Sequence, residues 1–105
     1  MAKPTIKAWS GSVGPNEETL RSRMKAEGLT PYAWSNAPND RYPPHVHGYH
    51  KVIYVVQGSI TFILPSTGEE ITLHAGDRLE LPAEVEHAAL VGAEGVACLE
   101  GHKPG

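Results

Sequence analysis

The chain has 105 residues, of which eleven are glycine, nine are proline and 40% are apolar, a composition that fits one globular domain with many turns. Its net charge of -3 and its scattered basic residues argue against a nucleic-acid partner, which would need a basic face. A single cysteine excludes an internal disulfide, and neither a signal peptide nor a membrane-spanning apolar run is visible. We therefore expect residues 1–105 to form a single cytoplasmic domain with neither nucleic acid nor membrane as a partner.

The first third of the chain predicts a short strand and a helix. Residues 5–9 are β-prone, and a turn-rich segment separates them from a helical pattern over residues 16–27. Asn16 suits the N-cap of this helix, and Gly28 is placed to end it. We expect the strand over 5–9 to pair across subunits in a homodimer, because a small domain with open sheets has edge strands to protect.

Short β-prone runs occupy the rest of the chain. The first covers residues 30–35 and leads into a loop over 36–44, whose two final prolines deliver an extended backbone to the next residue. Gln57-Gly58 is a hairpin signal that we expect to join strands over 52–56 and 59–64. Further strands are predicted at 70–74, 78–81, 85–91 and 95–100. Many short strands separated by turns are typical of a β-sandwich or barrel.

Histidines mark the candidate site. His45, His47 and His50 fall within six residues, and His87 lies on a later predicted strand. On an extended strand, residues two apart point to the same face, so His45 and His47 can act together. Because neutral imidazole is a good ligand for first-row transition metals, the histidines are candidate metal ligands.

The first of these segments resembles the first motif of the cupin family. That motif runs His-x-His, three or four residues, Glu, six residues, Gly, and residues 41–58 contain it. His45, His47 and Gly58 match, whereas Lys51 stands where the family usually has glutamate.

The second segment, residues 76–91, resembles the second cupin motif. Its Gly76, Pro82 and His87 match at the family's spacing. Two further positions depart from the motif, because Glu84 replaces a glycine and Val91 replaces an asparagine.

The resemblance, which covers residues 41–100, implies an all-β, double-sheet jelly-roll (cupin) barrel, here with one short N-terminal helix. It implies a divalent transition metal, iron, manganese, zinc or nickel, on His45, His47 and His87. Cupins host many unrelated activities, so two functions stay open. One is a metal-dependent enzyme acting on a small molecule, such as a dioxygenase with a three-histidine centre, or an isomerase. The other is a small-ligand-binding or sensing module without turnover.

Lys51 leaves the fourth coordination position open, because a protonated lysine has no lone pair to offer a metal. In one arrangement three histidines alone hold the metal, and in a second His50 replaces the glutamate because a bend turns it inward. A third arrangement has no metal, with Lys51 and the histidines binding an anion. Lys51 is thus a candidate catalytic residue, and a lysine turned out to solvent is the simpler alternative.

Other polar and aromatic side chains are candidates for substrate contact. Tyr54 and Arg78 are the two that we predict to bind substrate. For each there is a structural alternative, because aromatic residues in strands usually pack in the core and Arg78 can pair with Glu80 on the same strand face. His74 and His102 lie outside the motifs, and we expect both to be exposed.

Overall fold

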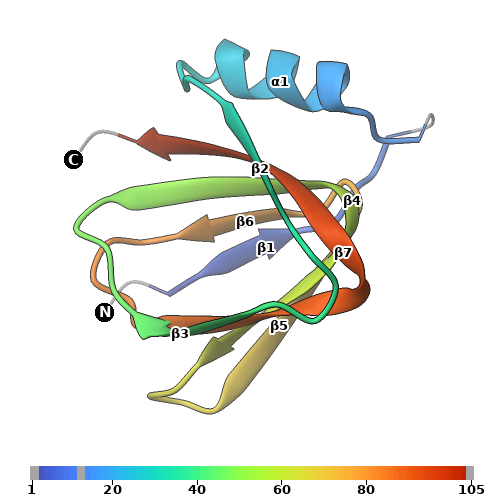
Figure 1. Ribbon diagram of the computed structural model, residues 1–105. Helices are drawn as coiled ribbons and strands as arrows, with labels where there is room; N and C mark the ends of the chain where they lie inside the picture. Colours follow the sequence, from blue (N-terminus) through green and yellow to red (C-terminus); the bar gives the residue numbers. More distant parts are fainter. Residues whose placement is uncertain (1–2, 12–13, 104–105) are drawn as a thin grey trace.

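The computed structural model describes residues 3–11 and 14–103. Its elements in chain order are β1 (Thr5–Lys7), α1 (Glu17–Ala26), β2 (Tyr32–Asn36), β3 (Arg41–His45), β4 (His50–Leu64), β5 (Glu69–His74), β6 (Arg78–Leu81) and β7 (His87–Lys103). The strands curl into a barrel, and α1 lies outside it across one end (Figure 1). This is the all-β jelly-roll barrel with one short helix that the sequence predicts. Within the described residues, no helix is long and apolar enough to cross a membrane.

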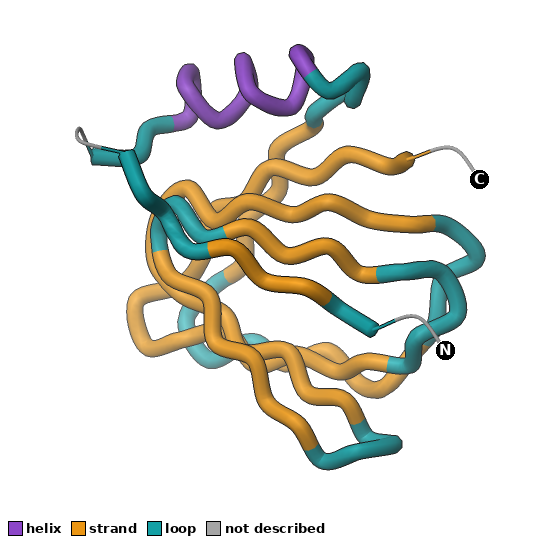
Figure 2. The backbone as a smooth tube through the Cα atoms, turned by 180° about the vertical axis from the view of Figure 1, so that it is seen from behind, coloured by secondary structure: helices purple, strands orange, loops and turns teal. Residues whose placement is uncertain are grey.

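The barrel is built around two long strands. All pairings are antiparallel, in the order β1-β6-β4-β7-β2, with β3 added beside β7 and β5 beside β4. Because β4 and β7 pair along most of their lengths and bend together, they carry the chain around the barrel (Figure 2).

The prediction of a hairpin at Gln57-Gly58 is wrong, because β4 continues through this dipeptide. Both halves of β4 pair with β7, and the register shifts on either side of this dipeptide. Gly58 has a φ of 82°, and a Cβ at this position would lie 2.1 Å from the carbonyl oxygen of Gly95. The glycine therefore serves a bulge that bends a continuous strand, not a turn that ends one. The strands expected at 85–91 and 95–100 likewise form the single strand β7.

Part of the loop expected over 36–44 is also a strand. β3 pairs with β7, and its register becomes irregular between Tyr42 and His45, where two prolines lack the N–H that a regular ladder needs. His45 is thereby placed directly opposite His87. The helix begins as predicted, because the Asn16 side chain accepts a hydrogen bond from the Thr19 N–H at 2.9 Å.

Two apolar clusters lie on opposite faces of β4. Ile53 and Val55 belong to the cluster inside the barrel. Val52 and Tyr54 belong to a second cluster, in which Leu20 of α1 also packs. Alternate residues of a strand face opposite sides, so the parity of a position on β4 decides whether its side chain reaches the barrel interior.

Candidate metal centre

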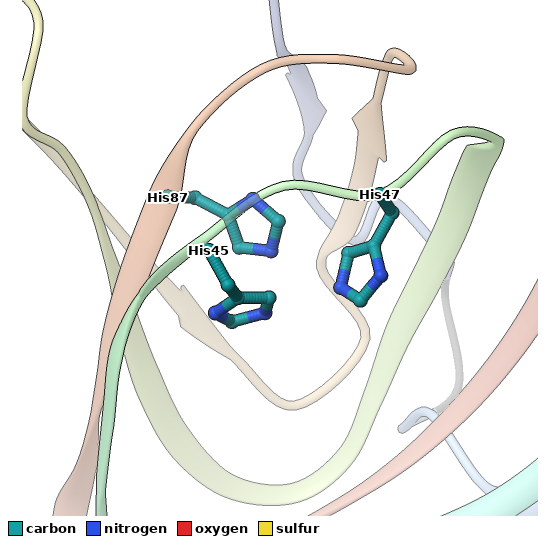
Figure 3. Close-up of side chains that lie close together, drawn as sticks. All are labelled: His45, His47 and His87. Carbon is teal, nitrogen blue, oxygen red and sulfur yellow. The ribbon is translucent and has the colours of Figure 1, made fainter.

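His45, His47 and His87 converge inside the barrel (Figure 3). One ring nitrogen of each lies within 4.8 Å of those of the other two. His45 ends β3 and His87 begins β7, so the two are cross-strand neighbours with ring centroids 4.3 Å apart. His47 follows in the segment between β3 and β4. Two strands and a short connection thus bring together residues 40 positions apart in the chain.

Backbone carbonyls fix which nitrogen of two histidines is free. Nδ1 of His45 lies 2.8 Å from the carbonyl oxygen of Pro43, and Nδ1 of His87 lies 2.9 Å from that of Val85. A carbonyl oxygen can only accept, so each Nδ1 carries the proton and donates. The lone pair of each ring is consequently on Nε2, and the second hydrogen bond orients the imidazole as in metal-ligating histidines.

His47 supplies the observation that fits a metal most directly. Its Nε2 is buried and has no hydrogen-bond partner among the residues that the structure describes. An unpaired buried polar atom is costly, and a metal ion would satisfy it. Burial lowers the pKa of His47, and the nearby positive charge of Lys51 lowers it further. Burial also lowers the pKa of His87 to about 4, so both rings are neutral at pH 7, the form that binds metal.

The three histidines border a cavity of about 360 Å³, a size typical of small-molecule sites. Its walls are largely apolar and aromatic, and its polar groups gather near the histidines. The remaining lining residues are Tyr32, Trp34, Tyr42, Tyr49, Lys51, Ile53, Ile60, Phe62, Ala89 and Glu100.

Lys51 faces this cavity and not the solvent. It shares the inner face of β4 with Ile53, and its side chain is only 12% exposed. Its Nζ lies 3.7 Å from Oε2 of Glu100, a carboxylate that is itself buried on β7. The expected alternative of a lysine turned out to solvent is therefore wrong.

Glu100 is a site residue that the sequence analysis missed. Its Oε2 accepts hydrogen bonds from the Tyr32 hydroxyl at 2.5 Å and from His102 Nε2 at 2.7 Å, and its Oε1 accepts one from Trp34 Nε1 at 3.1 Å. The alternation of side chains along the strand could have identified it. Glu100 stands two residues after the buried Cys98 and therefore faces the same side of β7. His102, although partly exposed as expected, belongs to this network.

His50 does not join the three histidines. It is one position from Lys51 and therefore lies on the outer face of β4, where its Nε2 donates to Oε1 of Glu80 at 2.9 Å. The chain does bend at residues 48–49, but this bend leaves His50 on the outer face.

Tyr54 and Arg78 lie outside the cavity, on the α1 side of the sheet. Arg78 donates to both carboxylate oxygens of Glu27 at 2.6 and 2.7 Å, to Glu80 at 3.1 Å and to the Tyr54 hydroxyl at 3.1 Å. The expected pair between Arg78 and Glu80 forms, as part of a cluster that ties α1 to the barrel. His74 is exposed and distant from the site, as predicted.

Glu84, which replaces a glycine of the second motif, keeps a backbone conformation that favours glycine. Its φ is 66°, in the left-handed region that favours glycine. Its N–H donates to the carbonyl oxygen of His47 at 2.8 Å, which ties the loop before β7 to the segment carrying the histidine.

Comparisons with known proteins agree with this geometry. The family model described as Cupin domain matches residues 34–100. A search of curated proteins finds no significant match. Among solved structures, a DUF861 family protein from Thermotoga maritima has a TM-score of 0.65 at 13% identity, over 96% of this chain and all of that one. A cupin-2 domain containing protein from Shewanella frigidimarina has a TM-score of 0.59 at 20% identity, over 73% of this chain and 71% of that one.

A further similar structure is the polyketide cyclase RemF from Streptomyces resistomycificus. It is 25% identical, with a TM-score of 0.63. The match covers 70% of this chain and 54% of that one, so it extends over about half of the cyclase.

Proposed function

This chain belongs to the cupin domain family, and on that basis we propose that it is a metal-dependent enzyme acting on a small molecule. His45, His47 and His87 would hold the metal through their Nε2 atoms. The observation that carries the proposal is the buried, unpartnered Nε2 of His47 beside two histidines whose Nδ1 protons are already engaged. His50 has no part in the proposed centre.

Three neutral nitrogen ligands leave coordination positions free, an arrangement that suits a dioxygenase-like reaction. Iron or nickel bound there would supply redox chemistry with dioxygen, and zinc or manganese would supply Lewis-acid polarisation of a substrate oxygen. Backbone carbonyls orient the imidazoles of His45 and His87, burial keeps those of His47 and His87 neutral, and apolar walls would surround the substrate and exclude water. Lys51 is the residue that we propose to contact the substrate.

The likeness to a polyketide cyclase supports an enzyme over a module without turnover. The cavity has the walls that a compact aromatic or enolic molecule would need, with Trp34, Tyr42 and Phe62 among its lining residues. A non-catalytic ligand-binding or sensing module is the second candidate. The observation that favours it is Lys51, which occupies the position of the family's glutamate ligand and can hold an anion without turnover.

Oxygen consumption separates the two functions. The protein is loaded anaerobically with Fe(II), mixed with a panel of small carboxylic acids, enols and catechols, and followed with an oxygen electrode. We expect substrate-dependent oxygen uptake that is lost in His47→Ala and kept in His74→Ala, a matched control at an exposed histidine. A ligand that binds, shown by a raised melting temperature, without turnover on Fe, Mn, Zn or Ni would favour the sensing module and contradict the enzyme.

We also propose that the protein is a cytoplasmic homodimer. Among the described residues, β1 pairs only with β6, so its other edge is free. Ile6 at the centre of β1 is 51% exposed, which supports a second copy covering this strand.

A further inference from the structure

The cavity contains a cation whose hydrogen-bonding capacity is largely unused. A lysine ammonium has three donors, and the partner of Lys51 among the described residues is Glu100 at 3.7 Å, beyond the usual range of an N–H···O hydrogen bond. Burial lowers the pKa of Lys51, although the Glu100 carboxylate opposes this. An incoming anion would therefore gain a close partner and relieve the poor solvation of the ammonium.

Glu100 is not free to move onto Lys51. Three donors from Tyr32, Trp34 and His102 hold its two oxygens. Although burial alone would raise the pKa of Glu100, its hydrogen bonds and the Lys51 charge lower it overall, so the carboxylate stays ionised. The pair keeps the lysine charged and fixed at the cavity wall while leaving its donors available.

Charge balance points to the same ligand class. The charges of Lys51 and Glu100 cancel, and the three histidine ligands are neutral, so a divalent metal would bring two uncompensated positive charges into a largely apolar cavity. In the usual cupin motif, the glutamate at position 51 would supply a negative charge. Here the carboxylate among the described lining residues, Glu100, is already balanced by Lys51, so a bound anion would supply this charge.

We propose that Lys51 is the anion-recognition residue of the cavity and that the natural ligand is a small organic carboxylate. Its carboxylate lies between the Lys51 ammonium and the histidine centre, and its apolar body packs against Ile53, Phe62 and Ala89. This proposal rests on the proposed metal-dependent function. The test must therefore separate failure of the metal site from failure of the anion site.

Benzoate and benzamide are a suitable probe pair, since they share size and shape and differ in charge. Their dissociation constants are measured by calorimetry on Zn(II)-loaded wild-type protein and on the Lys51→Met, Lys51→Arg and Lys103→Met variants, after metal content has been determined for each. Lys103→Met is the matched control, because this lysine bonds to Glu80 at 2.9 Å and does not line the cavity.

We expect wild-type protein to prefer benzoate, and Lys51→Met to weaken benzoate binding by about tenfold or more, as loss of a charged hydrogen bond implies. Benzamide affinity and metal content should be unchanged in Lys51→Met, Lys51→Arg should recover most of the benzoate affinity, and Lys103→Met should resemble wild type. If Lys51→Met fails to fold with Glu100 uncompensated, the Lys51→Met/Glu100→Gln variant makes the same test at the same net charge.

The outcomes are distinct. Equal affinity of wild-type protein for the two probes, no binding of benzoate at millimolar concentration, or benzoate binding unaffected by loss of Lys51 would each overturn the anion site. Protein that takes up no metal but still binds benzoate through Lys51 would contradict the proposed metal-dependent function and leave the anion site standing.

Discussion

A single residue, Lys51, decides how the histidine centre differs from the usual cupin site. Because it lies on the inner face of β4, a glutamate at this position would face the histidines. We predict that Lys51→Glu tightens metal binding by about tenfold or more, since it removes a positive charge and adds a ligand. A direct ligand should change metal affinity at least as much as a group that only orients a ligand. Affinity for manganese and iron should rise most. Competition with a chromophoric chelator measures the dissociation constants.

Three further variants make this result interpretable. His50→Ala is the matched neighbour on the outer face, and its metal affinity should equal that of the wild type. Lys51→Glu also creates a like-charge pair with Glu100, which should destabilise the metal-free protein, and Lys51→Glu/Glu100→Gln should relieve this cost. If Lys51→Met, which only removes the positive charge, bound metal as tightly as Lys51→Glu, the carboxylate would not ligate. A weakened His50→Ala would contradict the assignment of His50 to the outer face.

The histidines could be predicted from the sequence, but their surroundings could not. The motif spacing identifies His45, His47 and His87, which the fold brings together. Alternation from His45 and His47 already favours an inward Lys51, since residues 45, 47, 49, 51 and 53 all line the cavity, but no sequence pattern shows that this alternation continues through the break between β3 and β4. Glu100 depends on a pairing between strands that are distant in the chain.

At the scale of the elements, the Arg78 cluster joins α1, β4, β6 and β7. Although burial alone would raise the pKa of Glu80, hydrogen bonds from Lys103, His50 and Arg78 lower it to about 2. A carboxylate with a depressed pKa in the folded state stabilises the protein above its unfolded pKa, and this contribution is lost as pH falls from 4.5 towards 2.

We therefore predict that Glu80→Gln lowers the free energy of unfolding at pH 7 by on the order of 2 kcal/mol, reduced from the full linkage value by partial exposure. The difference from wild type should shrink as pH falls from 4.5 to 2. Urea denaturation at a series of pH values measures both. A difference that stays constant over this range would show that the Glu80 charge does not provide the stabilisation.

The bulge at Gly58 bends β4 within the barrel wall. We predict that Gly58→Ala costs about 2–4 kcal/mol of unfolding free energy, because the left-handed backbone and the approach of the Gly95 carbonyl both oppose a side chain. Gly68→Ala is a matched control, since Gly68 has a φ of 75° but open space around its Cβ position. Equal losses in the two variants, measured by denaturant unfolding, would show that steric contact at the bulge contributes nothing.

The bulge also explains the failed hairpin prediction. A glycine with positive φ serves a two-residue turn and a β-bulge equally well, and the local sequence is the same for both. What distinguishes them is that residues on both sides of Gly58 pair with β7, a contact with a distant segment. Strands bounded by local signals alone, such as Arg78–Leu81, could be predicted to the residue.

At the scale of the whole molecule, we predict a dimer formed through β1. Light scattering at micromolar concentration should give twice the chain mass, and Ile6→Lys should shift the protein towards monomer by placing a charge in the apolar interface. Val46→Lys is the control, because Val46 is equally exposed at 52% but lies in the segment between β3 and β4 and not on β1. A monomeric wild type, or equal effects of the two variants, would contradict this interface.

The histidine centre itself is tested most directly by the metal content of protein purified without a histidine tag, measured by elemental analysis with His47→Ala and His74→Ala alongside. We predict about one transition-metal ion per chain in wild type and in His74→Ala, and almost none in His47→Ala, because loss of one histidine removes one of the three protein ligands that hold the ion. Wild-type protein that stays empty after incubation with iron, manganese, zinc and nickel in turn, or His47→Ala that retains the metal, would contradict the account.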